Sequence, residues 1–185
     1  MTKMNLVNKL FQKSVIKKIE ETDWSFGTSS PFVVELDPTT VCDLACPGCI
    51  SGDLLNQKNP EDRGFAPKTI ESLAQEFIEM GVKAVILIGG GEPLAHPSTL
   101  KLIETLGENK IKVGLTTNGT LMHRYLQVIG KYVDWTRVSV DAGTDEMFLN
   151  LRPTANNKSK FRLVIDNMRD PVSYTHLTLP TNREV

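Results

Sequence analysis

The sequence has little that would mark a special partner or compartment. Aromatic residues make up only 6% of the 185 residues, and the 21 Lys and Arg nearly balance the 22 Asp and Glu. Both a basic field for nucleic acid and an acidic bias toward disorder are therefore lacking. No apolar run reaches the roughly 18 residues of a membrane span, and the start lacks the apolar block of a secretory signal. These absences predict a cytoplasmic protein with no membrane span and no nucleic-acid partner.

Cysteine is also scarce, because the chain has three cysteines and all lie in one short segment as Cys42, Cys46 and Cys49. A disulfide framework needs an even number of cysteines spread along a small secreted chain. An odd and clustered set in a reducing compartment indicates a metal or redox site instead. The 40% of apolar residues is enough for an ordinary core, and the length predicts one domain.

The end of the chain does not read as natural protein. The segment from Val172 to Thr181 matches the translation of a transposase-type sequencing adapter, and the neighbouring adapter bases account for Pro171 and Val185. We therefore expect residues 171–185 to be a translated adapter and exclude them from fold reasoning. Natural sequence would then end near Asp170 in the middle of a longer protein.

Hydrophobic periodicity predicts an α/β chain. Residues 4 to about 20 form an amphipathic pattern, so we expect residues 1–27 to be a helix and linker that pack on their own domain. Strands and helices are then expected to alternate, with strands at 32–36, 82–88, 111–116 and 135–140 and helices at 68–80, 98–107, 121–130 and 158–169. The nearly continuous apolar run at 82–88 predicts a strand buried on both faces. This alternation predicts right-handed βαβ units around a parallel sheet.

Unusual residues follow each of the four expected strands. The cysteine segment follows the first, Gly89–Pro93 the second, Thr116–Gly119 the third, and Ser139 with Asp141 ends the fourth. In a parallel α/β sheet or barrel the C-terminal strand ends share one face, which carries the active site. The sequence therefore predicts one site built from these four loops.

The cysteine spacing suits a compact metal centre. Cysteine thiolates are the ligands of iron–sulfur clusters, and three of them on a four-iron cluster leave one iron without a protein ligand. A structural zinc site is the alternative, but zinc needs a fourth ligand. With no further cysteine, His96 or His123 would have to supply it from another loop.

The glycine-rich turn favours a cationic group over a phosphate. Its glycines let a ligand approach the backbone, whereas Glu92 would repel pyrophosphate and Pro93 lacks an amide donor. Neither a spaced GxGxxG nor a Lys-Ser/Thr ending is present. Two further readings stay open, because Asn118 could serve a plain turn and Asp141 could cap the next helix.

Taken together, these residues resemble the radical S-adenosylmethionine (SAM) superfamily. Its CxxxCxxC motif is met by the three cysteines, its GGEP motif by Gly90–Pro93, and its Thr-Asn-Gly and Ser-x-Asp marks by Thr117–Gly119 and Ser139–Asp141. The segment Asp141–Thr144 and the following Arg152 look most like the molybdenum-cofactor and peptide-maturase branch. The resemblance covers about residues 32–168, within an expected core domain of residues 28–170.

The resemblance implies a partial (β/α)6 TIM-like barrel, truncated after about four βα units. It implies a [4Fe–4S] cluster on the cysteines and reductive cleavage of SAM to a 5′-deoxyadenosyl radical, which abstracts hydrogen from a small-molecule or peptide substrate. An electron donor such as flavodoxin or ferredoxin would reduce the cluster. The residues implied to bind metal are Cys42, Cys46 and Cys49, and those implied to bind SAM are Gly90, Gly91, Glu92, Pro93, Asn118, Ser139 and Asp141. No catalytic acid or base can be singled out.

The chain departs from the family pattern at two positions. Gly48 stands where a bulky residue usually packs near the adenine, so that contact would come from elsewhere, for example from Ile50. Asp43 stands where Asn usually follows the first cysteine. Strands five and six would lie beyond Asp170, and a chain that ends there is expected to be inactive. The alternatives are a non-catalytic iron–sulfur or zinc module, or an inactive fragment of such an enzyme.

Overall fold

The computed structural model describes residues 13–25, 30–52 and 63–169. The chain divides into two units, Met1–Pro31 and Phe32–Val185. The first unit contains helix α2 (Lys13–Glu21) with the exposed ion pair Lys17–Glu21. Residues 4–12 of the expected N-terminal helix and the expected adapter segment 171–185 lie outside the described residues. No helix in the described ranges is both long and apolar enough to cross a membrane.

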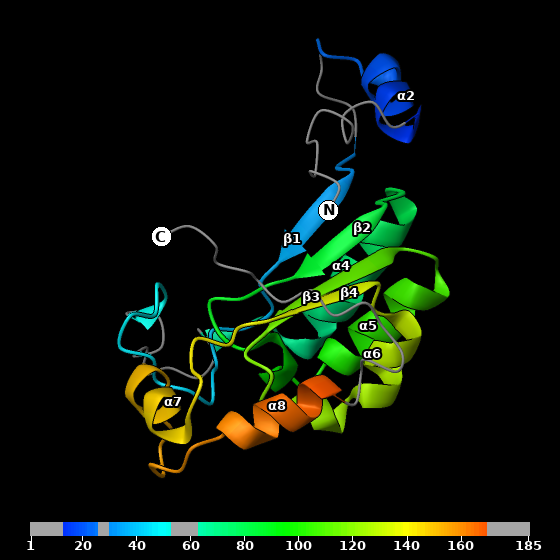
Figure 1. Cartoon of the computed structure of the whole chain (residues 1–185). Helices are drawn as coiled ribbons and strands as arrows, with labels where there is room; N and C mark the ends of the chain where they lie inside the picture. The colour runs from blue at the N-terminus through cyan, green and yellow to red at the C-terminus, as the bar shows by residue number, and fades with distance from the viewer. Residues whose placement is uncertain (1–12, 26–29, 53–62, 170–185) are drawn as a thin grey trace. The chain divides into compact units, whose positions relative to one another are not determined.

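The second unit is built on a four-stranded parallel sheet (Figure 1). Its strands are β1 (Val33–Leu36), β2 (Ala84–Leu87), β3 (Lys112–Thr117) and β4 (Trp135–Val138), in the spatial order β1-β2-β3-β4. Parallel neighbours need crossover connections, which contain the helices α4 (Pro67–Glu79), α5 (Thr99–Glu108) and α6 (Leu126–Tyr132). The predicted α/β fold is confirmed, as a partial (β/α)6 TIM-like barrel.

The two faces of the sheet differ in burial. The face toward the helices is closed and mostly apolar, with residues at or near zero exposure such as Val85, Leu87, Val113, Leu115 and Val138. The opposite face stays open, because alternate strand residues such as Ile86 and Arg137 keep accessible surface. The prediction that the second strand is buried on both faces is therefore wrong for the described residues, since Ala84 and Ile86 on the opposite face are only half-buried.

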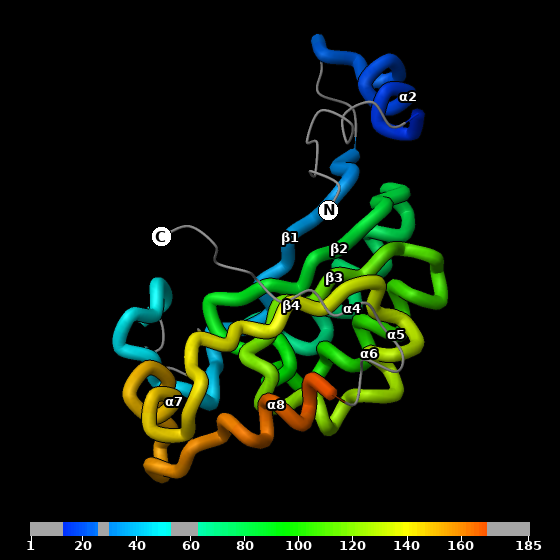
Figure 2. Tube along the Cα trace, viewed as in Figure 1, coloured from blue at the N-terminus to red at the C-terminus, as the bar shows by residue number. Residues whose placement is uncertain are grey.

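Some elements differ from the sequence prediction. The single helix expected at 121–130 is divided into the short helix η3 (Met122–Arg124) and α6. The 3-10 helix η2 (Pro93–Ala95) and helix α7 (Asp145–Leu151) were not predicted. Figure 2 shows the chain passing from β4 through α7 to α8 (Phe161–Arg169).

Helix α7 is anchored by one aromatic residue. Phe148 is fully buried and its ring lies 6.4 Å from that of Phe161 in α8.

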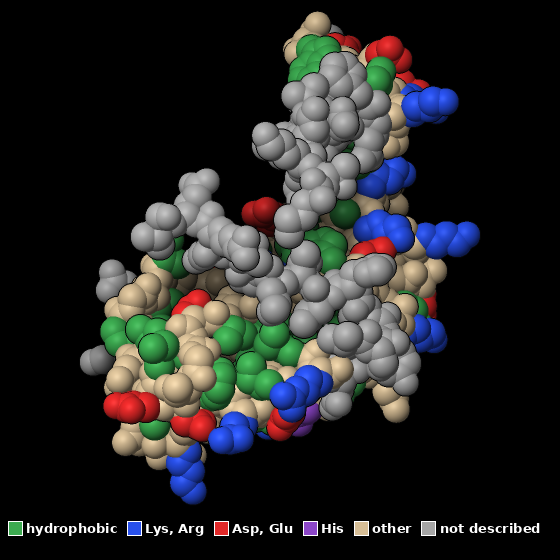
Figure 3. Space-filling view, in the orientation of Figure 1, with side chains coloured by type: hydrophobic (Ala, Val, Ile, Leu, Met, Phe, Trp, Pro, Cys, Tyr) green, Lys and Arg blue, Asp and Glu red, His purple; other side chains and the backbone are tan. Residues whose placement is uncertain are grey.

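Other large apolar side chains of the second unit remain exposed. Figure 3 shows hydrophobic side chains gathered on the face of the molecule that this view presents. Two of them, Ile50 and Leu151, stand at the pocket described below.

The cap of α7 provides a test of this fold. The hydroxyl of Thr144 accepts a hydrogen bond from the amide of Met147 at 3.2 Å. We expect Thr144→Ala to lower the free energy of unfolding by about 1 kcal/mol, because a free helix amide then loses its partner. Thr144→Ser keeps the hydroxyl and is expected to stay close to the parent in urea denaturation. Equal midpoints for all three chains would contradict the capping assignment.

Candidate functional site

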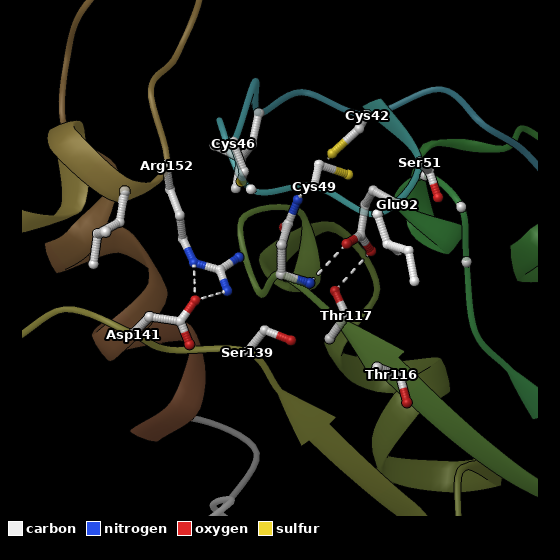
Figure 4. A pocket seen from close by; sticks show the side chains of 18 of the residues that line it. Cys42, Cys46, Cys49, Ser51, Glu92, Thr116, Thr117, Ser139, Asp141 and Arg152 are labelled. Carbon is white, nitrogen blue, oxygen red and sulfur yellow. Dashed lines mark hydrogen bonds and ion pairs between the residues drawn. The ribbon is translucent and has the colours of Figure 1, made fainter. Parts of the chain in front are cut away.

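One pocket of about 610 Å³ lies at the C-terminal ends of the strands (Figure 4). All but one of the expected site residues line it: Cys42, Cys46, Cys49, Gly90, Gly91, Glu92, Asn118, Ser139 and Asp141. The exception is Pro93, which is buried in η2 and whose carbonyl oxygen accepts a hydrogen bond from the Thr99 hydroxyl at 2.6 Å. The tertiary structure thus brings the four loops together, as the parallel strand order requires.

The cysteines lie on a loop of successive turns. The amide of Cys49 donates to the carbonyl of Cys46 at 3.1 Å, and the loop is fastened by the amide of Ala45 to the carbonyl of Pro153 at 2.8 Å. Burial raises the pKa of the Cys42 and Cys46 thiols, with Arg152 opposing the rise at Cys46. Burial thus disfavours the thiolate form of both side chains, and a bound metal centre would favour it.

The donor set fits an iron–sulfur cluster by chemistry. All three free thiols are half-buried and line the same pocket, and soft sulfur ligands select iron–sulfur clusters or zinc. Across residues 13–25, 30–52 and 63–169, no three His, Cys, Asp or Glu side chains stand close enough to hold one metal ion. The thiols are thus gathered at one pocket without forming a compact single-ion site.

Neither histidine is placed to complete a zinc site. Nε2 of the buried His96 lies 2.8 Å from the carbonyl oxygen of Phe65, and its Nδ1 accepts from the amide of Ser98. His123 is exposed and lies beside Asn167. Both lie outside the pocket lining, so the zinc alternative gains no histidine ligand from the described residues.

The carboxyl of Glu92 holds two loops together. It is 1% exposed, and Oε1 accepts from the amide of Leu94 at 3.1 Å and from the hydroxyl of Thr117 at 2.6 Å. Oε2 accepts from the amide of Asn118 at 2.7 Å. Burial raises the pKa of Glu92 to about 7, although these hydrogen bonds oppose the rise. Figure 4 shows Glu92 and Thr117 joined below the cysteine loop.

The glycines of the turn are required by the chain itself. The amide of Gly91 donates to the carbonyl of Thr39 at 3.0 Å, and a Cβ on Gly91 would collide with the backbone of Thr40 and Val41. The amide of Gly90 donates to Asp37 Oδ2 at 2.5 Å. At Gly91, the space that the sequence suggested for a ligand is taken by the segment leading into the cysteine loop.

Asn118 serves the turn and the site together. Its Oδ1 accepts from the amide of Thr120 at 2.9 Å, which stabilises the turn. Its Nδ2 donates to Asp43 Oδ1 at 2.9 Å and lies 3.7 Å from Cys42 Sγ. The side chain therefore connects the β3 loop to the cysteine loop.

Asp43 is the centre of a network that the sequence did not reveal. Its Oδ2 accepts from the Thr120 hydroxyl and pairs with Lys160 Nζ, each at 2.6 Å. Burial opposes ionisation of Asp43, but the hydrogen bonds from Lys160, Thr120 and Asn118 outweigh it and keep its pKa below the ordinary value. The only signal in the sequence was the departure from Asn at this position.

Asp141 and Arg152 form an ion pair across the pocket edge. Nε of Arg152 donates to Asp141 Oδ2 at 3.0 Å, and Nη2 contacts the same oxygen. Asp141 does not cap α7, because Thr144 does so. Ser139 lines the pocket and its amide donates to the carbonyl of Thr117 at 2.9 Å. Arg137 also lines the pocket, and sequence reasoning missed it.

The fold and the site define a partial (β/α) barrel with a three-thiol loop above a pocket at its strand ends. The family model of the Radical SAM superfamily matches residues 36–175, and the chain belongs to this superfamily. The chain is 29% identical over 147 residues to a GTP 3′,8-cyclase of Staphylococcus carnosus, covering 76% of this chain and 41% of that protein. It is 34% identical over 115 residues to molybdenum cofactor biosynthesis protein 1 of Dictyostelium discoideum, covering 60% of this chain and 18% of that protein.

Solved structures show the same fold. Streptococcus suis SuiB bound to its precursor peptide SuiA superposes with a TM-score of 0.65 at 20% identity, covering 100% of this chain and 40% of SuiB. The protein anSMEcpe with bound AdoMet gives a TM-score of 0.65 at 19% identity, covering 81% of this chain and 43% of that one. The chain thus spans about two fifths of the length of SuiB, of anSMEcpe and of the S. carnosus cyclase.

The raised pKa of Glu92 predicts a pH dependence of stability. Between its ordinary pKa of 4.5 and about 7, the folded chain keeps a proton that the unfolded chain has lost. The free energy of unfolding should therefore fall as pH rises through this window, by up to about 3 kcal/mol, and level off above it. Denaturant titrations at several pH values measure this.

The control is Glu92→Gln, which cannot titrate. Its absolute stability is expected to be lower. One carboxyl oxygen that accepts a hydrogen bond in Glu92 is replaced by an amide NH2 group, which can only donate. The decline between pH 4.5 and about 7 should nevertheless be missing from the variant. The same slope in both chains would assign the pH dependence to another group.

The Asp43–Lys160 pair can be tested by a double-mutant cycle. Lys160→Met, Asp43→Asn and the double variant should give a coupling energy of about 1 kcal/mol or more, because the partly buried charges share a hydrogen bond. Urea denaturation of the four chains measures it. Lys158→Met, at an exposed lysine on the same segment, should leave stability within about 0.5 kcal/mol. A coupling near zero would show that the ion pair contributes nothing.

Proposed function

We propose that the chain is the SAM-binding core of a radical SAM enzyme. In this proposal Cys42, Cys46 and Cys49 hold a [4Fe–4S] cluster, and SAM lies in the pocket beneath them. The observation that carries it is the convergence of the three thiols and the glycine turn on one pocket of about 610 Å³, in a chain that belongs to the superfamily. When bound, the cluster and SAM supply reductive cleavage to a 5′-deoxyadenosyl radical, which abstracts hydrogen from the substrate.

The thiols and the turn have distinct tasks in this proposal. Three cysteines give one ligand fewer than a four-iron cluster has irons, which leaves one iron to the amino-acid end of SAM. Because the carboxyl oxygens of Glu92 are occupied by Leu94, Thr117 and Asn118, Glu92 positions the loops. The amino group of SAM is then left to the backbone of Gly90 and Gly91.

The remaining pocket residues would orient the rest of SAM. Ser139 and Asp141 would contact the ribose or the methionine end, with Asp141 held by Arg152. Asn118 would line the cavity and keep the Cys42 loop in place. Ile50 is fully exposed at the pocket, which suits the apolar contact with adenine that Gly48 cannot make. The protein's part is binding, orientation and exclusion of water.

The substrate is proposed to be a small molecule or a peptide. A small molecule is supported by similar proteins that are named GTP 3′,8-cyclases. A peptide is supported by the similar structure of SuiB, which holds a precursor peptide. An electron donor such as flavodoxin or ferredoxin would act in the cytoplasm. In the full-length protein, further strands and helices outside this SAM-binding core would complete the barrel.

Anaerobic reconstitution with iron and sulfide tests the proposal. We expect the reduced chain to show a [4Fe–4S] electron paramagnetic resonance signal that changes when SAM is added. Cys46→Ala should lose the cluster, measured as iron per chain, because two thiolates do not retain it. Lys158→Met is the matched surface control and should bind iron like the parent. A colourless chain with stoichiometric zinc, or a cluster retained in Cys46→Ala, would refute the assignment.

A further inference from the structure

Besides the three cysteines, four ionisable side chains line the pocket, and three of these four have hydrogen-bond or ion-pair partners within the chain. Glu92 is buried and hydrogen-bonded three times, and Asp141 is paired with Arg152. The side chain of Arg137 makes no hydrogen bond or ion pair with any residue of the described ranges. It is therefore the one basic side chain of the pocket lining whose charge has no partner in the described part of the chain.

The strand register places Arg137 on the open face of the sheet. Thr136 and Val138 on either side of it are 0% exposed and face the helices, so Arg137 faces the opposite way. It is in register with Thr116 of β3, which also lines the pocket. Ser139 lies two residues further along the same face, about 7 Å away by strand geometry. Arg137 thus lies deeper along the sheet than Ser139.

An aromatic residue shares this face of β4 with Arg137. Trp135 is two residues before Arg137, on the same face, and is in register with Gly114. A Cβ on Gly114 would lie 2.5 Å from Cε2 of Trp135, so the indole rests directly against the bare backbone of β3. The glycine leaves room for the ring over β3, and strand alternation puts the ring on the same face of β4 as Arg137.

We propose that Arg137 anchors an oxyanion of the substrate, a carboxylate or a phosphate, with the adjoining part of the substrate against Trp135. This inference rests on the proposed function, because it assigns the substrate end of the same pocket. A guanidinium binds either group through two parallel, charge-assisted hydrogen bonds. The substrate class that follows is an anionic molecule or peptide side chain with a planar or apolar portion next to the charge.

Trp135 provides the reporter for a direct test. The chain has two tryptophans, and the other, Trp24, is 75% exposed in the first unit. In a Trp24→Phe background without cluster, pyrophosphate and succinate are titrated separately at constant ionic strength while the Trp135 fluorescence is followed. We expect a saturable change with one of the two anions, which identifies the phosphate or the carboxylate as the group bound.

Variants of Arg137 decide the assignment. Arg137→Gln should lower the affinity for that anion at least tenfold. Arg137→Lys should have an intermediate affinity, because lysine keeps the charge but loses the planar guanidinium fork. Arg124→Gln removes an exposed cation outside the pocket lining and should bind like the parent. Equal urea midpoints show that the variants are folded. No saturable binding, or equal affinity in Arg137→Gln, would overturn the inference.

Spectroscopy separates this inference from the proposed function. In the reconstituted chain, Arg137→Gln should keep the cluster signal and its change on addition of SAM. If the variant loses the SAM-induced change, Arg137 binds the carboxylate of SAM and the substrate assignment is overturned. If the parent chain itself shows no response to SAM, the proposed function fails.

Discussion

A single buried carboxyl group, that of Glu92, connects the loops on which the site depends. It receives the amides of Leu94 and Asn118 and the hydroxyl of Thr117, so the β2 and β3 loops are fixed to each other. Asn118 then reaches Asp43, next to Cys42, and continues the connection into the cysteine loop. Burial outweighs these hydrogen bonds and raises the pKa of Glu92 to about 7. Keeping this carboxyl ionised inside the fold therefore costs free energy.

The electrostatics of the pocket follow from which charges find partners. Asp43 is matched by Lys160 and Asp141 by Arg152, so two carboxylates near the thiols are neutralised by cations from the α7–α8 region. This arrangement avoids adding negative charge to a loop that, in the proposed function, carries thiolates. Arg137, on the open face of the sheet, has no such partner in the described ranges, which is why it is the group assigned to an anionic ligand.

Much of the fold could be predicted from the sequence, because periodicity and turn residues are local signals. The four strands and the helices α4 and α5 appear close to their expected positions. Helix α7 was missed because its seven residues are too short for a periodic pattern, although Thr144 with Asp145 and Glu146 is typical of a helix start. Burial of the second strand was overpredicted, because an apolar run does not tell whether anything covers its second face.

The sequence by itself determined the superfamily, the parallel order of the strands and the set of residues at their ends. These follow from motif spacing and from the rule that parallel strands end on one side. Only the tertiary structure decided what those residues do for one another. It showed that Glu92 is enclosed, that Gly91 makes room for Thr40 and Val41, that Lys160 reaches Asp43, and that Arg137 is unpaired within the described ranges. The reason is physical: a hydrogen bond or ion pair between residues distant in sequence depends on distances that no local pattern encodes.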